Sequence, residues 1–335
     1  MKTEVLAMLR ASDGYVSGQQ ICEKFGVSRT AVWKIINALK DEGYVIEAAQ
    51  NKGYRITGYP DILTKEEIAS VIKLEGVKTF ASDISFNETV DSTNNVAKKM
   101  AEDGAAHGTL VVAEQQTGGK GRRGRHWVSP SGTGIWMTYI LRPDITPDRA
   151  SMLTLVAAMA TAEGIQKHIS RVGSDAVCAI KWPNDIVLNS KKIVGILTEM
   201  SAEPDCVNYV VTGIGINVNM TEFEEDIKEN ATSILKETDC RMRRSEIIGT
   251  ITKKFEEYYE TFIKTADLSA LADSYNSILI NKGRQVRISA SGGEEETGTA
   301  VGIDDRGGLL ITRDDGTVRS VIAGEVSVRG LYGYV

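Results

Sequence analysis

The stretch SGQQICEKFGVSRTAVWKIINALKDEGY, residues 17–44, decides how the first part of the chain folds. It holds two segments with apolar residues at helical spacing, and each follows a serine that can cap a first helical turn, Ser17 and Ser28. Gly26 stands where the first helix has to end, and Gly43 where the second does. The stretch therefore predicts two helices joined by a turn of about three or four residues.

The flanking segments complete a small domain. Residues 3–11 have apolar residues at helical spacing, and residues 44–56 alternate like two strands around a turn at Asn51, Lys52 and Gly53. Two helices joined in this way form a helix-turn-helix, whose second helix can enter the major groove of DNA, and the hairpin is its wing. The predicted DNA-contacting residues are Ser28, Arg29, Thr30, Lys34, Asn37 and Lys52.

The placement of charge favours a local role in DNA binding. The chain has 39 basic and 45 acidic side chains and a net charge of -6, so no positive field covers the whole molecule. Residues 1–60 carry eight basic and six acidic side chains, which gives +2 and leaves -8 for the remainder. The alternative is a small helical domain whose charges only solvate it, because helix-turn-helix shapes also occur in proteins that never touch DNA.

The rest of the chain predicts an α+β domain followed by a small β domain. After a linker that contains Pro60, strand-like and helical segments alternate, which indicates a substantial mixed sheet. From about residue 282 short strands and glycine turns indicate a small barrel. We expect three domains, 1–60, 61–280 and 281–335. The strand-like segments are 84–90, 109–115, 134–143, 176–183, 185–200 and 208–220, and the helical ones are 92–104, 146–169 and 243–265.

Composition argues against several classes of protein. No window approaches the roughly 18 apolar residues of a membrane helix, and the N-terminus is too short and too charged for a signal peptide. We therefore expect a cytoplasmic protein without a membrane partner. The cysteines and histidines do not cluster, so no metal site or disulfide framework is predicted. These residues are Cys22, Cys178, Cys206, Cys240, His107, His126 and His168.

The segment AEQQTGGKGRRGRHW, residues 113–127, is a basic loop rich in glycine. Its glycines let the backbone approach an anion closely, and its cations can bind phosphate or carboxylate. It matches neither the Walker pattern nor the dinucleotide-binding glycine pattern. Taken alone, it also fits a solvated surface loop or a second nucleic-acid contact. The cations are Lys120, Arg122, Arg123 and Arg125.

Two further segments place polar groups where a strand ends. In DSTNN, residues 91–95, the Ser92 and Thr93 hydroxyls and a helix N-terminus can hold a small polar ligand, although plain helix capping is the commoner use. In KWPND, residues 181–185, Lys181 ends an apolar strand and would point into any cavity that the sheet forms. The alternative is an ordinary surface lysine.

A fourth segment, VTGIGINVN at 211–219, is an apolar strand in which Gly213 and Gly215 would let a ligand lie against the backbone, or would mark only a bulge. The marks DSTN, QTGGKGRRGR, KWPND and GIGINV, in this order and spacing, closely resemble the biotin protein ligase family. With the winged helix and the β-rich tail, the resemblance covers essentially the whole chain. It points to the bifunctional form, a biotin ligase that is also the repressor of the biotin operon.

This resemblance implies a fold and a reaction. The central domain would have the biotin/lipoate-ligase fold and the tail would be a small barrel like Src-homology-3 domains. Ligases of this family join biotin to ATP, which gives biotinyl-5'-adenylate and pyrophosphate, and then pass biotin to a lysine of a biotin carboxyl carrier protein. Magnesium is expected to assist at the phosphates. In the repressors the adenylate is the co-repressor, and it favours a homodimer that binds operator DNA.

The resemblance also assigns site residues. Lys181 and Arg122 are the expected catalytic residues. One departure is visible, because Lys120 stands where the family usually has arginine, which keeps the charge and loses the planar guanidinium. The expected biotin-binding residues are Ser92, Thr93, Asn94, Gln116, Lys120, Gly121, Arg122, Lys181, Gly213 and Gly215, and the expected adenylate-binding residues are Arg122, Arg123, Trp127 and Asn217.

Three alternatives remain open at this point. The protein could be a transcription factor that senses biotin without catalysis, which the intact KWPND and GRRGR segments argue against. It could be a lipoate or octanoate transferase, which shares the reaction logic, although the helix-turn-helix and the spacing of KWPND favour biotin. It could also be a ligase whose winged helix does not bind DNA.

Overall fold

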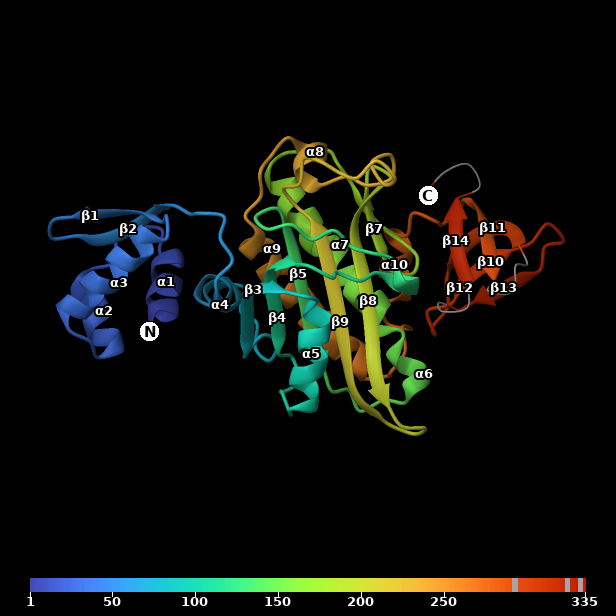
Figure 1. The fold of residues 1–335 in the computed structure, drawn as a ribbon, viewed down its shortest axis with the longest axis horizontal. Helices are drawn as coiled ribbons and strands as arrows, with labels where there is room; N and C mark the ends of the chain where they lie inside the picture. Colours follow the sequence, from blue (N-terminus) through green and yellow to red (C-terminus); the bar gives the residue numbers. More distant parts are fainter. Residues whose placement is uncertain (291–294, 323–325, 331–333) are drawn as a thin grey trace.

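The computed structural model describes residues 1–290, 295–322, 326–330 and 334–335, which form three folded parts arranged in a row (Figure 1). The first part is the predicted winged helix, in which the wing pairs as an antiparallel hairpin. Its third helix is the expected DNA-reading helix. The elements are α1 (Lys2–Arg10), α2 (Gly18–Phe25), α3 (Arg29–Asp41), β1 (Val45–Ala49) and β2 (Gly53–Gly58).

Local signals set the ends of these helices as the sequence predicts. Ser17 and Gln20 form a capping box, with the Ser17 hydroxyl accepting the Gln20 N–H at 3.1 Å and the Gln20 side chain accepting the Ser17 N–H at 2.9 Å. The Ser28 hydroxyl accepts the Ala31 N–H at 3.2 Å at the start of α3. Gly26 ends α2 in the left-handed conformation, with φ of +66°.

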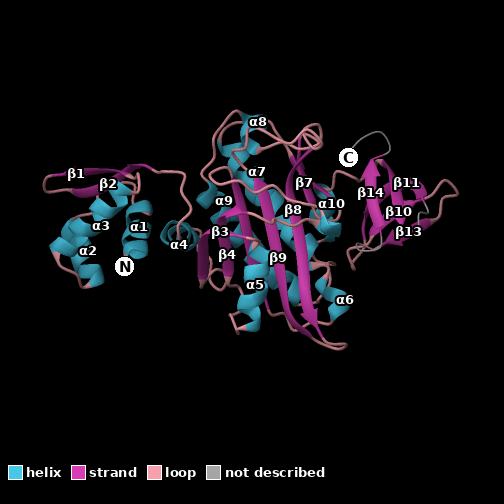
Figure 2. Ribbon diagram, viewed as in Figure 1, coloured by secondary structure: helices cyan, strands magenta, loops and turns pink. Residues whose placement is uncertain are grey.

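The central part is built on a seven-stranded mixed sheet, drawn in magenta in Figure 2. The strand order is β3-β4-β5-β9-β8-β7-β6, and only β3 and β4 run parallel. Its strands are β3 (Ile84–Val90), β4 (Leu110–Gln116), β5 (Gly134–Leu141), β6 (Cys178–Lys181), β7 (Asp185–Leu188), β8 (Lys191–Ala202) and β9 (Val207–Asn217). Its helices are α4 (Lys65–Leu74), α5 (Thr93–Glu102), α6 (Pro147–Ala150), α7 (Leu153–Arg171), α8 (Ile234–Thr238), α9 (Arg244–Ile263) and α10 (Ala272–Ser277).

The two faces of this sheet bury different helices. Alternate residues of β4 show this, because Leu110 and Val112 join the main core with α7 and α9, whereas Val111 joins a smaller core under α5. Figure 1 shows α5 in front of the sheet. In the part of the chain that the structure describes, no helix is long and apolar enough to cross a membrane.

Two expectations for the central part need correction. The helix expected over 146–169 is two helices, α6 and α7, with Ser151 and Met152 between them. The strand expected over 185–200 is the hairpin of β7 and β8, because Asn189 and Ser190 adopt positive φ of 50° and 71° and reverse the chain.

The expected small β domain is an antiparallel sheet with the order β13-β12-β11-β10-β14. Among the described residues β13 and β14 are its edges. The last strand that the sequence predicts, GEVSVR at 324–329, is described from Val326 on as β14, and residues 324–325 lie outside the description. The Trp182 indole N–H donates to the Gly307 carbonyl at 3.0 Å and ties this part to the central one. The strands are β10 (Gln285–Ala290), β11 (Glu295–Ile303), β12 (Leu309–Thr312), β13 (Val318–Val321) and β14 (Val326–Gly330).

The winged helix has a hydrophobic core of its own, separate from the core that the other two parts share. It is joined to the central part by a buried polar group that we call the Glu67 cluster, namely Arg10, Tyr44, Glu67 and Ser245. Arg10 Nη2 donates to both Glu67 carboxylate oxygens at 2.7 Å. The Ser245 hydroxyl donates to the same carboxylate at 2.7 Å. The Tyr44 hydroxyl also donates to it. The Glu67 side chain is fully buried.

Candidate functional site

A cavity of about 810 Å³ opens between the sheet and the basic loop. Its walls come from the start of α5, the ends of β4 and β6, strands β7 to β9, and loop residues 120–128. Every residue that the resemblance assigned to biotin or adenylate lines this one cavity. These residues are Ser92, Thr93, Asn94, Gln116, Lys120, Gly121, Arg122, Arg123, Trp127, Lys181, Gly213, Gly215 and Asn217.

One end of the cavity is neutral and polar. The Thr93 N–H donates to Gln116 Oε1 at 2.8 Å, and Gln116 Nε2 donates to the Ser129 hydroxyl at 2.9 Å. The Thr138 hydroxyl of β5 lies 2.8 Å from both the Thr93 hydroxyl and Asn94 Oδ1. These contacts fix the orientation of donors and acceptors that could otherwise rotate. The end is therefore suited to a small ligand that offers both kinds of hydrogen-bonding group.

The start of α5 is not a simple helix cap. Ser92 holds the N-cap position and is buried, yet within the described structure its hydroxyl makes no capping hydrogen bond. The Asn94 amide donates to Glu199 Oε2 at 2.8 Å, and Lys98 pairs with Glu199 Oε1 at 2.7 Å. Burial alone would raise the pKa of Glu199, but the hydrogen bonds from Lys98 and Asn94 hold it below its ordinary value. The site therefore keeps a charged carboxylate behind Asn94.

Two glycines of β9 allow close packing in the cavity wall. A Cβ on Gly213 would stand 2.1 Å from Asn94 Oδ1, and a Cβ on Gly215 would stand 2.6 Å from Trp127 Nε1. A side chain at either position would have to displace the side chain of Asn94 or Trp127. The sequence predicted that a ligand would lie against this backbone. In the structure the Asn94 amide covers Gly213 and the Trp127 indole covers Gly215.

The other end of the cavity gathers charge. Lys181 ends β6 with only 5% of its surface exposed, which excludes the surface-lysine alternative. Asp185 Oδ1 pairs with Lys192 Nζ at 2.6 Å, and Arg122 Nη1 donates to Asn184 Oδ1 at 3.0 Å. Burial alone would raise the pKa of Asp185, but Lys192 holds it below its ordinary value. Three cations and one carboxylate thus surround a partly enclosed space, which suits a ligand of high negative charge.

The basic loop is folded back on itself at the mouth of the cavity. The Trp127 N–H donates to the Gly119 carbonyl at 2.9 Å, and the Gly121 N–H donates to the Arg125 carbonyl at 2.7 Å. Arg123 at the tip has a φ of +58°, a left-handed conformation that is uncommon for residues other than glycine. The loop therefore has a defined shape in this structure.

The cations of this loop point in different directions. Arg122 is half-buried and reaches Asn184, whereas Arg123 and Arg125 are exposed at the rim. Lys120 is exposed as well, and its Nζ lies 3.4 Å from Asn95 Oδ1 on α5. The position where the sequence departs from the family pattern thus lies at the rim of the cavity.

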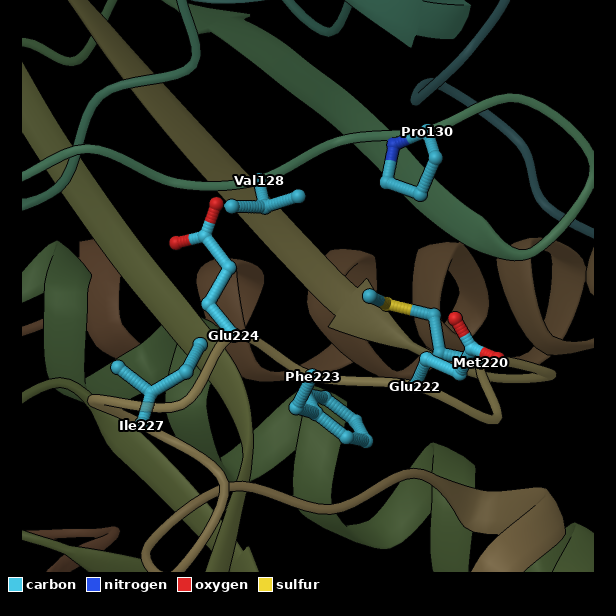
Figure 3. A pocket seen from close by; sticks show the side chains of 7 residues that line it. All are labelled: Val128, Pro130, Met220, Glu222, Phe223, Glu224 and Ile227. Carbon is cyan, nitrogen blue, oxygen red and sulfur yellow. The ribbon is translucent and has the colours of Figure 1, made fainter.

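A smaller cavity of about 290 Å³ adjoins the large one and shares five lining residues with it. Figure 3 shows Val128 and Pro130, which follow the basic loop, on one side, facing Met220, Phe223 and Ile227 of the segment after β9. Acidic side chains stand among these apolar ones in the same segment, at Glu222 and Glu224. The apolar surface beside Trp127 is the kind that a planar ring could cover.

Most of the residues expected to contact DNA lie on the exposed surface of α3 and of the wing, and one exposed aromatic side chain lies among them. Arg29, Thr30 and Lys34 are exposed on α3, and Lys52 is exposed at the tip of the wing. Ser28 is exposed but also caps α3, and Asn37 is half-buried. Trp33 lies between these residues with 58% of its surface exposed, which is unusual for a tryptophan.

Sequence reasoning missed several residues of the site. Thr138, Asp185 and Lys192 line or support the cavity but stand in apolar or unremarkable strands. Asp185 is the last residue of the KWPND segment, and this position was the one sequence feature that could have marked it as a site residue. Lys192 reaches the cavity because β7 and β8 pair as a hairpin, which a single sequence does not reveal.

The fold is a helix-turn-helix domain joined to a mixed-sheet domain with a ligand-sized cavity, and matches to known families identify the second as a ligase domain. The Biotin/lipoate A/B protein ligase family matches residues 86–217. An HTH domain matches residues 2–55, and the Biotin protein ligase C terminal domain matches residues 283–329. The three matches follow the three folded parts of the chain.

Relatives over the full length narrow the assignment. The chain is 38% identical to the Bifunctional ligase/repressor BirA of Bacillus subtilis over 95% of each chain. It is 30% identical to the protein of the same name in Escherichia coli, over 97% of this chain and 96% of that one. A solved biotin protein ligase from Aquifex aeolicus, in complex with biotin and ATP, superposes with a TM-score of 0.63 at 28% identity and covers 74% of this chain and 99% of its own. The chain belongs to the family of bifunctional biotin ligase/repressors.

Proposed function

We propose that the protein adenylates biotin with ATP, transfers biotin to a lysine of a biotin carboxyl carrier protein, and represses transcription with the adenylate as co-repressor. The observation that carries the ligase half is the two-ended cavity, with neutral donors and acceptors at one end and the cations Lys181, Arg122 and Lys192 at the other. Biotin has a neutral polar head and a carboxylate tail, and ATP supplies the phosphates. The cavity offers suitable groups to each.

The chemistry needs charge compensation more than acid–base groups. The biotin carboxylate attacks the α-phosphate of ATP, which forms a mixed anhydride and releases pyrophosphate. Both reactants are anionic, so Lys181 and Arg122 lower the barrier by stabilising the charge that builds on the transferring phosphate. Thr93, Asn94 and Gln116 bind the biotin head group, and they hold the carboxylate at the cationic end.

The second step transfers the biotinyl group. The amine of the acceptor lysine attacks the acyl carbon, AMP leaves, and an amide forms. The basic loop closes over the adenylate before this step and shields the anhydride from water. Trp127, Arg123 and Asn217 contact the adenylate in this proposal, and all three line the cavity.

Magnesium enters this proposal as part of the ATP substrate. Within the described part of the chain no group of three or more histidine, cysteine or acidic side chains is placed to hold a metal. The carboxylate nearest the lysines, Asp185, is engaged by Lys192. Mg²⁺ usually keeps several waters and binds through substrate phosphates, so it can enter with ATP without a dedicated set of protein ligands.

The ligase half is tested with purified protein, biotin, MgATP and a biotin carboxyl carrier domain. We expect the carrier to gain the mass of one biotinyl group, as read by mass spectrometry, and pyrophosphate to be released. Lys181→Met should slow pyrophosphate release by about 100-fold or more. Lys191→Met removes an exposed lysine of β8 and is the matched control, with wild-type rates expected.

Three results would count against this half. An unmodified carrier would favour a sensor without catalysis. Labelling with lipoate or octanoate in place of biotin would favour the related transferases. Wild-type rates in Lys181→Met would show that the catalytic assignment is wrong.

The repressor half rests on the exposed face of α3 and on the wing. We propose that the adenylate favours a homodimer, which places two α3 helices on a palindromic site, and that both activities belong to the cytoplasm. Duplexes selected from a random pool should bind more tightly with biotin and MgATP than without. Arg29→Ala and Trp33→Ala should each weaken binding, whereas Lys40→Ala, at the far end of α3, should not. If the affinity for DNA in gel shifts is the same with and without biotin and MgATP, the repressor half of the proposal is wrong.

A further inference from the structure

One aromatic side chain of the C-terminal part reaches the cationic end of the large cavity. Tyr334 follows β14 and lines this cavity together with Lys181. The centre of the Tyr334 ring lies 3.3 Å from Lys181 Nζ. The Tyr334 hydroxyl donates a hydrogen bond of 2.6 Å to Asp185 Oδ2. A residue from outside the seven-stranded sheet therefore contacts both charged side chains of the 181–185 segment.

The ring limits where the Lys181 ammonium can lie. A lysine side chain loses much rotamer freedom when it is held in one place, so a defined position needs a specific attraction. The negative face of an aromatic ring attracts an ammonium, and most strongly where water is excluded. Lys181 is 5% exposed, so its contact with the ring is of this stronger kind.

The ring is itself held in place and leaves the cavity open. Asp185, which accepts the Tyr334 hydroxyl, is anchored through its other oxygen by Lys192 at 2.6 Å. Tyr334 is thus held through Asp185 of β7 and Lys192 of β8. With the ring in place the cavity still measures about 810 Å³, which is within the range of ligand sites. The ring therefore forms a wall of the site and does not fill it.

We propose that Tyr334 is a positioning residue for the adenylation step, whose ring holds the Lys181 ammonium at the point where the biotin carboxylate meets the phosphate. The proposal rests on the proposed function, in which Lys181 stabilises the transferring phosphate. Tyr334 acts through Lys181 and does not touch the reacting atoms. The catalytic site is then completed by the C-terminal part of the chain.

Two substitutions in the full chain separate the ring from the hydroxyl. Tyr334→Phe keeps the ring and loses the bond to Asp185, and Tyr334→Met keeps the apolar bulk and loses the ring. Pyrophosphate release is measured as kcat and KM with biotin and MgATP. We expect Tyr334→Met to lower kcat by about 10-fold or more with KM for biotin within about 2-fold, and Tyr334→Phe to stay within about 3-fold of wild type.

A matched control uses a tyrosine that contacts a lysine elsewhere. Tyr258 on α9 lies 5.8 Å from Lys254 Nζ, away from the cavity, and Tyr258→Met should keep wild-type kcat. Biotin binding without ATP, measured by calorimetry, shows whether the rest of the site is intact.

The outcomes separate this inference from the proposed function. Wild-type protein that releases no pyrophosphate would sink the proposed function. With active wild type, a Tyr334→Met variant as fast as or faster than wild type would overturn the positioning role. So would a Tyr334→Phe variant as slow as Tyr334→Met, because the ring would then not matter. Loss of biotin binding in Tyr334→Met would also overturn it, since the residue would then act through folding.

Discussion

Lys120 and Arg122 stand two positions apart in the basic loop and have different surroundings. Lys120 is exposed, and its Nζ lies 3.4 Å from Asn95 Oδ1. Arg122 is half-buried and donates to Asn184, which in turn donates to the Ile196 carbonyl of β8. Burial, the largest influence, lowers the pKa of Arg122, and the charge of Asp185 opposes that change. We therefore expect a planar guanidinium to be needed at position 122, whereas at position 120 lysine or arginine should serve equally well.

This difference predicts opposite results for two conservative changes. Lys120→Arg, which restores the family's usual residue, should leave kcat/KM for biotin within about 2-fold, because either cation can lie at the rim. Arg122→Lys should lower kcat/KM by about 10-fold or more, because lysine lacks the planar guanidinium that bonds Asn184 at this half-buried position and keeps further donors for the ligand. Steady-state pyrophosphate release measures both. A large gain in Lys120→Arg would show that the rim position grips the ligand.

At the scale of elements, the contact between α7 and α9 contains a buried histidine. His168 Nε2 lies 3.0 Å from the Thr250 hydroxyl. Burial lowers the pKa of His168 to about 4, against about 6.5 in an unfolded chain. Between these two values the unfolded chain binds a proton that the folded protein does not. The folded protein therefore loses stability as the pH falls from about 6.5 to about 4.

We expect His168 to account for a loss of about 2 to 3 kcal/mol in the free energy of unfolding across that range. His168→Gln keeps a hydrogen-bonding group for Thr250 and cannot be protonated, so its stability should fall less between pH 7 and pH 4.5. Urea denaturation at the two pH values measures the difference. His126→Gln, at an exposed position, should keep the wild-type drop. Equal drops in all three proteins would contradict the assignment.

The Glu67 cluster joins α1 to α4 and α9. Arg10 is 3% exposed and Glu67 is fully buried, so removal of Arg10 would leave a carboxylate without its counter-charge. Arg10→Met should lower the free energy of unfolding by about 3 kcal/mol. Lys65→Met breaks a pair with Asp83 in which both side chains are 60% exposed, and should change it by about 0.5 kcal/mol or less. Urea denaturation of both variants tests the contrast, and equal effects would contradict it.

The ends of helices could be predicted from the sequence where a residue close by in the chain sets them. Ser17, Gly26 and Ser28 act on their own helices, so the ends of α2 and α3 follow from neighbouring letters. The turn between β7 and β8 was missed because its residues, Asn189 and Ser190, take positive φ without a glycine to signal it. The residues marked by family motifs line one cavity, as their shared role would require.

Residues outside the motifs could not be found, because distance along the chain hides them. Thr138 joins the site only because β5 lies beside the start of α5, and Lys192 only because β8 folds back on β7. Tyr334 meets Lys181 across 153 positions of sequence. Such contacts follow from the tertiary arrangement, which no short pattern records.

At the scale of the molecule, the described residues form two large hydrophobic cores, besides the smaller one under α5. One lies within the winged helix, and the other runs from the central sheet into the C-terminal strands, with Val286 and Ile311 among its buried residues. Because each core is packed within its own part of the chain, we expect each part to unfold separately.

Calorimetry of the whole chain should therefore show two unfolding transitions. Ile36→Ala, in the core of the winged helix, should lower one of them, by about 2 to 5 kcal/mol in stability. Biotin with MgATP should raise the other, because the ligands bind the central part. A single transition that moves with both changes would show that the two cores unfold together.

The separate core of the winged helix also has a consequence in genetics. Missense alleles at its buried positions, such as Val32 or Ile36, should leave cells able to attach biotin while the controlled genes are expressed without restraint. Alleles at buried positions of the shared core should cost growth unless a second copy of the gene supplies the ligase. A cell that carries one allele of each group has an active ligase in one chain and an intact winged helix in the other. It should regain both activities only if repression does not need both parts in the same chain.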